Sequence, residues 1–403
     1  GTRIAYWQLD TSGVPEFTLI NNTDALYPRL TTFAYPKVGQ QNSACRVGVV
    51  AATGGETRWL NVPGDPRQHY LARLSWTPDS QGLVLQQLNR RQNTNLVLLA
   101  DASTGQVTTI LTERDEAWVD VDDEWKWLAD GQRFAWISDR DGWRHVYLAS
   151  CGGQDVKLAT PGEFDVTELL HVDEGQNCLY FVASPDNPTQ RYLYRIGWDG
   201  TKLERITPAA QKGWHAYQIS PNGRYAIHSG SAADSPPVVE LVDLPQHSAK
   251  RVLAENAELR KRFGELQKTP TEFVRVDIGD DVSLDGWCLK PPDLDATKKY
   301  PLLVYVYGEP AGQTVVDRWG GRNYLWHLML AQRGYVVMSF DNRGTPAPRG
   351  RAWRKAMYRK LGILGPADQA AALEKMLAVR PYLDPQRVVV AGGSYGGYMS
   401  LAV

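Results

Sequence analysis

A turn of Asp, Asn or Gly followed by an apolar strand recurs four times between residues 75 and 230, and this repeat constrains the fold more than any other feature. The glycines of the four phrases lie at steps of 49, 44 and 48 residues; they are Gly82, Gly131, Gly175 and Gly223. A polar turn and a second apolar strand come after each phrase, and a third strand often follows. Several short strands in each unit of about 40–50 residues are typical of the blades of a β-propeller.

A β-sandwich would also show periodic strands without helices, but the recurring phrase favours the propeller. The repeat accounts for four to five blades up to about residue 250. The text at residue 1 reads as the middle of a strand, so we expect further blades before it. We predict a partial β-propeller of several four-stranded blades over residues 1–267.

The pattern of repeated short strands ends near residue 255, where a segment typical of a helix begins. A short charged helix is predicted within residues 255–268, and a β-hairpin with its turn at Gly279–Asp280 follows. Three apolar strands then alternate with helical segments; the strands read YPLLVYVYGEP, GYVVMSFDNRG and RVVVAGGSYGG. Strands of this kind indicate a parallel sheet that is buried on both faces. We therefore predict a second domain of the α/β type over residues 268–403.

Composition excludes several classes of protein. Hydrophobic residues make up 43% of the chain and charged residues 22%, as in folded globular proteins. The net charge of −1 offers no general electrostatic attraction to nucleic acid or to an anionic membrane. No apolar run approaches the roughly 20 residues that span a bilayer.

The cysteines indicate neither a metal centre nor a redox motif. Cys45, Cys151, Cys178 and Cys288 form no C-x-x-C pair. Three of the four lie in strand-like text, where a small buried apolar side chain is expected. A Cys151–Cys178 disulfide stays open at this stage. We expect no metal ion and no organic cofactor.

The motif Gly392-Gly393-Ser394-Tyr395-Gly396 is a G-x-S-x-G. In α/β hydrolases this motif forms a sharp turn from a strand to a helix, with the nucleophilic serine at its apex. The three valines at 388–390 supply the strand, and YMSLAV can begin the helix. The alternative is a glycine-rich turn with a solvent-facing serine. We predict that Ser394 is a nucleophile, which makes residues 268–403 the N-terminal half of an α/β-hydrolase domain.

A serine nucleophile needs a base, and in this fold the catalytic triad runs Ser, acid, His along the chain. All seven histidines precede Ser394. His327 lies on an apolar helical stripe and is predicted to be a packing residue. We therefore expect the triad acid and histidine to follow Val403, so that this chain is a segment of a longer hydrolase.

Together, the pieces YPLLVYVYGEP, SFDNRGT, RVVVAGGSYGGYMS and SDRDGWRHVYL resemble the prolyl oligopeptidase clan of serine peptidases. The dipeptidyl peptidase IV branch, in its bacterial form, is the most similar. The resemblance implies that Ser394 is the nucleophile. It also implies that the Tyr307 hydroxyl and the Tyr395 backbone N–H donate hydrogen bonds to the oxyanion. The alternative for Tyr307 is a tyrosine at a strand end with its hydroxyl in water.

Sibling branches of the clan differ at short motifs. The acylaminoacyl-peptidase branch often has HGGP where this chain has YGEP, which favours the dipeptidyl branch. The chain departs from that branch at Gly393, where a tryptophan is common, and in the text around Gly365 and Pro366, where more acidic residues are expected. The paired glutamates that hold the substrate amine in this branch have no match here, and we expect them before Gly1. The acidic segment Asp120–Trp125 is predicted to be a solvated loop.

The resemblance implies a serine exopeptidase that releases N-terminal Xaa-Pro and Xaa-Ala dipeptides through an acyl-enzyme on Ser394. The alternatives within the clan are acylaminoacyl, tripeptidyl and prolyl oligopeptidases. An inactive propeller that serves as a binding scaffold is the alternative from another class. The resemblance further implies peptide substrates with a free N-terminus, a homodimer, and a periplasmic or secreted location.

Overall fold

The computed structural model describes residues 1–153 and 155–403. It divides into two compact units. The first contains residues 1–136 and 148–157, and the second contains residues 137–147 and 158–403. The predicted domain boundary near residue 268 falls inside the second unit and stays a prediction.

The first unit is built from small antiparallel sheets. One has the order β1 (Arg3–Asp10), β4 (Ala44–Ala51), β5 (Arg58–Trp59). Another runs in sequence order through β6 (His69–Trp76), β7 (Gly82–Asn89), β8 (Thr94–Asp101) and β9 (Val107–Arg114). Inward-facing side chains from both sheets, such as Val47, Val49, Leu83 and Leu85, form one buried core. Val47 and Val49, like Leu83 and Leu85, are two positions apart and therefore lie on the same face of their strand.

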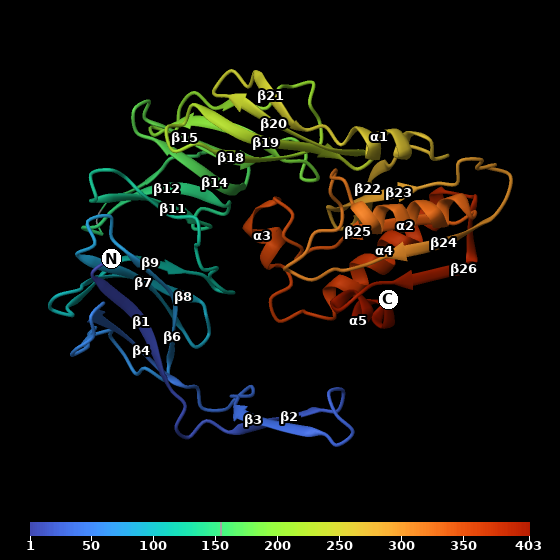
Figure 1. The fold of residues 1–403 in the computed structure, drawn as a ribbon. Coiled ribbons are helices and arrows are strands. Elements are labelled where there is room, and N and C mark those ends of the chain that lie inside the picture. The colour runs from blue at the N-terminus through green and yellow to red at the C-terminus, as the bar shows by residue number, and fades with distance from the viewer. Residues whose placement is uncertain (154) are drawn as a thin grey trace. The chain divides into compact units, whose positions relative to one another are not determined.

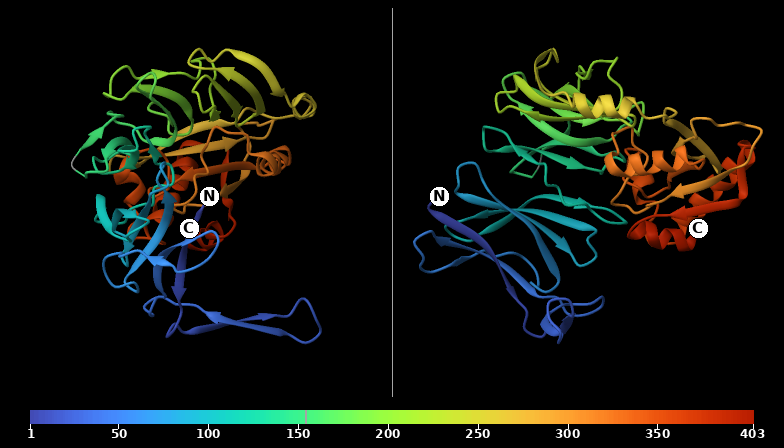
Figure 2. Two further views of the ribbon diagram at one scale, coloured as in Figure 1. Left: turned by 60° about the vertical axis from the view of Figure 1, so that its left-hand side comes forward. Right: turned by 45° about the vertical axis from the view of Figure 1, so that its right-hand side comes forward.

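A hairpin separates β1 from β4 in the sequence. It consists of β2 (Glu16–Asn21) and β3 (Arg29–Ala34), which pair with each other as a sheet of two strands. The hairpin extends away from the other sheets of its unit (Figures 1 and 2). Many of its apolar side chains are therefore exposed.

A third sheet has the order β10 (Lys126–Trp127), β11 (Arg133–Ser138), β12 (His145–Ser150), β13 (Val156–Leu158). The division between the two compact units runs through its strands β11 and β12. On the side of the first unit, Phe134 and Trp136 are fully buried among aliphatic side chains.

Two further four-stranded sheets open the second unit. The first runs through β14 (Val166–Asp173), β15 (Cys178–Ala183), β16 (Tyr192–Gly197) and β17 (Glu204–Arg205). The next runs through β18 (Trp214–Ile219), β19 (Tyr225–Ala232), β20 (Ser235–Asp243) and β21 (Ala249–Ala254). In each four-stranded sheet of the chain, the strand of the repeated phrase is the second strand: β7, β11, β15 or β19. The predicted four-stranded blades are thus confirmed.

The rest of the second unit alternates strands and helices. Its elements are α1 (Ala257–Gly264), β22 (Glu272–Gly279), β23 (Val282–Leu289), β24 (Tyr300–Tyr305), α2 (Gly321–Gln332), β25 (Val336–Asp341), α3 (Gly350–Lys355), α4 (Leu364–Val379), β26 (Leu383–Ala391) and α5 (Tyr395–Ala402). The strands form one sheet in the order β22-β23-β25-β24-β26. The strands β25, β24 and β26 are parallel, as predicted, whereas β22 and β23 are antiparallel.

The predicted hairpin turn at Gly279–Asp280 is wrong by one residue. Gly279 pairs with Val282, so the two turn residues are Asp280 and Asp281. Both have positive φ angles, 52° and 57°. A two-residue hairpin turn of type I′ requires this conformation at both positions, and Asp tolerates it better than most residues.

Helices cover the two faces of this five-stranded sheet (Figure 1). On one face, side chains of α4 and α5 pack with Val304, Met338 and Phe340. On the other face, α2 packs against Leu303 and Val337. The strands β24 and β25 are thus buried on both sides, which explains their continuous apolar text.

Two further expectations, on the cysteines and on the segment Asp120–Trp125, are contradicted or settled by the structure. All four cysteines are free, so the Cys151–Cys178 disulfide does not form. The expectation that Asp120–Trp125 is a solvated loop is wrong at Asp122, which is buried and exchanges hydrogen bonds between its backbone and the Gln86 side chain. The sequence gives no signal for this contact, because Asp122 and Gln86 are 36 positions apart.

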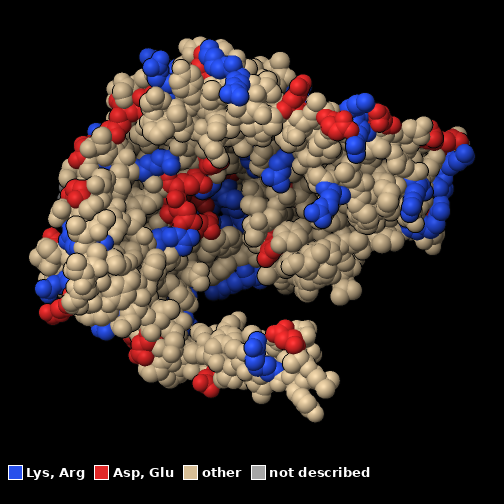
Figure 3. Space-filling view, viewed as in Figure 1, with Lys and Arg blue, Asp and Glu red and all other residues tan. Residues whose placement is uncertain are grey.

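The surface carries charges of both signs. Acidic and basic side chains are interspersed on the face shown in Figure 3. Within residues 1–153 and 155–403, no helix is long and apolar enough to cross a membrane.

Candidate active site

Ser394 lies at the turn between β26 and α5. The strand ends at Ala391 and the helix begins at Tyr395. Ser394 has φ 55° and ψ −121°, a conformation that side-chain-bearing residues rarely adopt and that costs about 1–3 kcal/mol. The turn leaves Ser394 exposed.

The glycines around Ser394 permit this turn. A Cβ on Gly392 would lie 2.3 Å from the carbonyl oxygen of Val306, and one on Gly396 would lie 2.2 Å from the same atom. Any larger residue at these two positions would force the strands apart. Gly393 differs, because a Cβ there would meet no atom within 4 Å. The site therefore has room for a side chain at position 393.

Tyr307 follows the neighbouring strand β24. Tyr305 pairs with Ala391 in the parallel ladder, and the Val306 N–H donates to the Ala391 carbonyl at 3.0 Å. Parallel neighbouring strands end at the same edge of a sheet. The loops that carry Tyr307 and Ser394 therefore leave from the same edge, side by side.

The Tyr307 hydroxyl has a partner in this structure. It donates a hydrogen bond to Oε2 of Glu309 at 2.5 Å. This contact with a carboxylate is the main reason that the pKa of Tyr307 is raised above its usual value. The hydroxyl therefore keeps its proton at neutral pH, as a hydrogen-bond donor must.

The third predicted residue, Tyr395, is the first residue of α5. The first N–H groups of a helix have no partner within the helix and point out from its positive end. The backbone N–H of Tyr395, next to Ser394, is thus positioned like an oxyanion donor. The structure brings Ser394, Tyr307 and Tyr395 to one sheet edge, and their catalytic roles stay predictions.

His327 lies among aromatic rings on α2. It is buried, and its ring centroid is 5.3 Å from that of Trp287 and 4.9 Å from that of Tyr305. Burial lowers its pKa to about 4. These contacts agree with the prediction that it is a packing residue.

Sequence reasoning missed two residues that shape the Tyr307 loop. Asp341 is the last residue of β25 and accepts hydrogen bonds from the Thr314 N–H and hydroxyl, both at 2.9 Å, and from the Val315 N–H at 3.1 Å. Burial raises its pKa to about 6. Asn342 donates to the Gly308 carbonyl at 3.2 Å. An Asp-Asn pair at the end of an apolar strand was the available signal.

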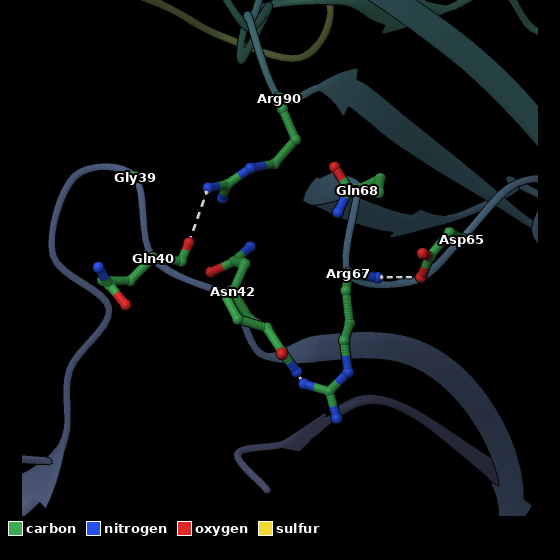
Figure 4. Close-up of a pocket in the computed structure, with 8 residues that line it drawn as sticks. Gly39, Gln40, Asn42, Asp65, Arg67, Gln68 and Arg90 are labelled. Atoms are coloured by element: carbon green, nitrogen blue, oxygen red, sulfur yellow. Dashed lines mark hydrogen bonds between the residues drawn. The ribbon is translucent and has the colours of Figure 1, made fainter. Parts of the chain in front are cut away.

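The first unit contains a polar pocket, which is a second candidate site (Figure 4). Its volume is about 460 Å³, and it is lined by Gly39, Gln40, Gln41, Asn42, Asp65, Arg67, Gln68 and Arg90. Arg67 binds the Asn42 carbonyl and the Asp10 carboxylate, both at 3.0 Å, while Arg90 binds the Tyr70 hydroxyl at 2.6 Å. Both guanidinium groups thus serve the local fold, and we assign no ligand to this pocket. Among the residues that the structure describes, no His, Cys, Asp and Glu side chains are grouped so that they could hold a metal ion.

Four-stranded blades followed by a hydrolase sheet with a strained serine turn define a class, the propeller-bearing α/β hydrolases. Residues 1–237 match the family model of the dipeptidyl peptidase IV N-terminal region, and residues 323–403 match that of the prolyl oligopeptidase family. The chain belongs to the dipeptidyl peptidase IV family, within the prolyl oligopeptidase clan.

Individual relatives agree with this assignment. A protein of Emericella nidulans named "Probable dipeptidyl peptidase 4" is 26% identical over 98% of this chain and 53% of its own length. The dipeptidyl peptidase 4 of Arthroderma otae is 26% identical over 99% of this chain and 53% of its own length. The crystal structure of Porphyromonas gingivalis dipeptidyl peptidase 4 matches with a TM-score of 0.92 and 32% identity, over 100% of this chain and 56% of that one. The chain spans about half the length of the curated relatives it matches.

Proposed function

We propose that the full-length protein is a serine exopeptidase that releases N-terminal Xaa-Pro and Xaa-Ala dipeptides from peptides. The observation that carries the proposal is the strained turn at Ser394, beside the loop of Tyr307, in a chain of the dipeptidyl peptidase IV family. A backbone conformation this costly persists where the surrounding structure enforces it, and such positions gather at active sites.

The proposed reaction has two steps. The Ser394 oxygen attacks the carbonyl carbon of the second residue, and the peptide beyond it leaves with a proton on its new amine. Water then attacks the acyl-enzyme, which frees the dipeptide and restores the serine hydroxyl. The oxyanion of each tetrahedral intermediate accepts hydrogen bonds from the Tyr307 hydroxyl and the Tyr395 N–H. The histidine and the acid that move the serine proton are proposed to come from the rest of the full-length protein.

The dipeptide length is proposed to follow from the substrate amine. Carboxylates that bind a protonated N-terminus fix its position through charge-assisted hydrogen bonds. A fixed amine determines which peptide bond reaches Ser394, so cleavage is counted from the N-terminus. The acylaminoacyl, tripeptidyl and oligopeptidase alternatives would cleave other substrates, and an inactive scaffold would cleave none.

Labelling with a fluorophosphonate tests the nucleophile. This probe phosphonylates an activated serine, so the full-length protein should be labelled and its Ser394→Ala variant should not. Ser400→Ala is the matched control, because Ser400 lies on α5 and its hydroxyl donates to the Gly396 carbonyl at 2.7 Å. Equal labelling of the protein and the Ser394→Ala variant would show that another serine reacts.

A homodimer and a periplasmic or secreted location belong to the same proposal. The β2–β3 hairpin supports the dimer, because Leu26, Tyr27, Ile20 and Leu30 are 92, 82, 66 and 64% exposed, and apolar surface of this kind marks interaction sites. Sedimentation should show a dimer at micromolar concentration, and Leu26→Glu with Tyr27→Glu should favour the monomer.

Fractionation of the source cells tests the proposed periplasmic or secreted location. A monomeric wild-type protein, or one retained in the cytosol, would overturn the respective proposal.

A further inference from the structure

The loop that begins at Tyr307 continues past Asp317, and its backbone is packed directly against the tyrosine ring. A Cβ on Gly312 would lie 2.4 Å from Cε1 of Tyr307, so only glycine lets the ring pack so tightly against position 312. A shift of the backbone at Gly312 would therefore move the ring. The next residue along, Gln313, is one of the points at which a blade contacts this loop.

Arg191 makes that contact from the start of a blade strand, just before β16. Its Nη2 donates to Oε1 of Gln313 at 3.0 Å. Its Nη1 donates to the carbonyls of Pro188 at 2.9 Å and Gln190 at 2.7 Å. The guanidinium lies over the Trp214 ring, 4.5 Å from its centroid. The blade thus holds the planar guanidinium group in a fixed orientation, and its Nη2 donor points at the loop.

Neighbouring residues fasten the loop to the same turn. Nε2 of Gln313 donates to the Pro188 carbonyl at 3.2 Å. The Asp317 N–H donates to the Thr189 carbonyl at 2.8 Å, and the Asp317 carboxylate accepts from Nε2 of Gln190 at 2.7 Å. Residues 188–191 therefore bind the loop at two places, and Arg191 is the member of this turn that carries a charge.

The burial of Arg191 is costly. Its relative exposure is 5%, and burial is the main reason that its pKa falls to about 10. Within the described part of the chain, Arg191 forms no direct ion pair with a carboxylate; its hydrogen bonds go to carbonyl and amide oxygens, and the carboxylates of Asp165 and Asp341 attract it from farther away. Burying a charge without a directly bonded carboxylate is unfavourable, so a fold retains it where its donors are needed.

We propose that Arg191 is a positioning residue for peptide cleavage: through Gln313 it holds the loop that places the Tyr307 hydroxyl at the oxyanion. This inference rests on the proposed role of Tyr307. A misplacement of about 1 Å can lower a rate roughly 10²-fold, so loss of the contact should reduce kcat. KM should change less, because the oxyanion donor acts in the transition state.

The test compares two blade arginines in the full-length protein. Arg191→Met keeps the length and apolar packing of the side chain but removes its donors, and we expect kcat for Gly-Pro-anilide to fall at least about 10-fold with KM within about 3-fold. Arg205→Met is the matched control. Arg205 also lies over an aromatic ring, 3.5 Å from the Tyr192 centroid, and donates to the carbonyls of Thr207, Pro208 and Gln211. Its described contacts do not involve the loop, so Arg205→Met should keep wild-type kcat.

A double-mutant cycle separates positioning from general stability. If Arg191 acts through Tyr307, Arg191→Met should have almost no further effect on kcat in the Tyr307→Phe background. Effects that multiply would overturn the proposal, as would a normal kcat in Arg191→Met. Gln313→Ala breaks the contact from the loop side and gives the same readout if Arg191→Met does not fold. If Tyr307→Phe alone has normal kcat, the proposed role of Tyr307 fails, and that result is distinct from failure of the Arg191 inference.

Discussion

At the scale of single residues, the site depends on backbone geometry that few side chains tolerate. Ser394 is held at φ 55° by two glycines that approach the carbonyl of Val306. Tyr307 depends on a polar contact instead, since its single hydroxyl proton is donated to Glu309. In the proposed role of Tyr307, the oxyanion competes with that carboxylate for the same proton, so the hydroxyl would turn away from Glu309 during the reaction.

Replacement of Tyr307 tests this residue directly. In the full-length protein, Tyr307→Phe should lower kcat by roughly 10²–10³, the usual loss for one oxyanion donor. KM for Gly-Pro-anilide should change little, because the donor acts mainly in the transition state. Tyr225→Phe is the control, since Tyr225 is a 40% exposed tyrosine on β19. A near-normal kcat in Tyr307→Phe would leave Tyr307 as a strand-end tyrosine only.

At the scale of elements, the blade of β18–β21 contains a buried histidine cluster. Nδ1 of His215 lies 2.8 Å from Nε2 of His228, and Nε2 of His247 lies 2.9 Å from the Tyr217 hydroxyl. Burial is the largest cause that lowers the pKa of His215 to about 3 and that of His228 to about 4. Glu240 lies 3.3 Å from the other nitrogen of His228, and this single carboxylate does not offset the burial. The blade therefore folds around neutral histidines.

Acid should destabilise this blade. Because the folded pKa values lie below the unfolded value of about 6.5, the unfolded chain takes up protons first, and stability falls as pH drops below about 6.5. At pH 5 the loss is about 2 kcal/mol for each histidine held neutral. The urea midpoint of the full-length protein should therefore fall between pH 7.5 and pH 5.0, and by less in His215→Gln. An equal fall in both proteins would show that the cluster does not control the pH response.

The sequence predicts some elements more accurately than others. The repeated phrase predicted the second strand of every four-stranded sheet, because turn residues and alternation act locally. The sequence did not predict the exact hairpin turn at Asp280–Asp281, because two aspartates there take a positive-φ conformation that Asn and Gly adopt more often. Asp122 was also missed, because its burial depends on Gln86, 36 residues away.

At the scale of the whole molecule, the sequence predicted the family and the strand-to-helix turn at Ser394, but not the contacts that connect the blade with the sheet of β22–β26. The turn at Ser394 has a short sequence motif. The contact of Arg191 with Gln313 joins residues 122 positions apart, and no sequence motif marks it. The roles of Ser394, Tyr307 and Tyr395 stay predictions. The central claim is therefore a claim about the complete protein: cleavage at Ser394 is counted from a free N-terminus.

The measurement that tests this claim most directly is kcat/KM of the full-length protein for Gly-Pro-anilide and for its N-acetylated form. Acetylation removes the charge of the amine and leaves the carboxylates proposed to bind it unpaired, at a cost of about 2–5 kcal/mol. The account predicts that kcat/KM falls well over 10-fold on acetylation, and that Ser394→Ala cleaves neither peptide. If the acetylated peptide is cleaved as well as or better than the free one, the dipeptidyl assignment is contradicted, and an acylaminoacyl peptidase or an oligopeptidase takes its place.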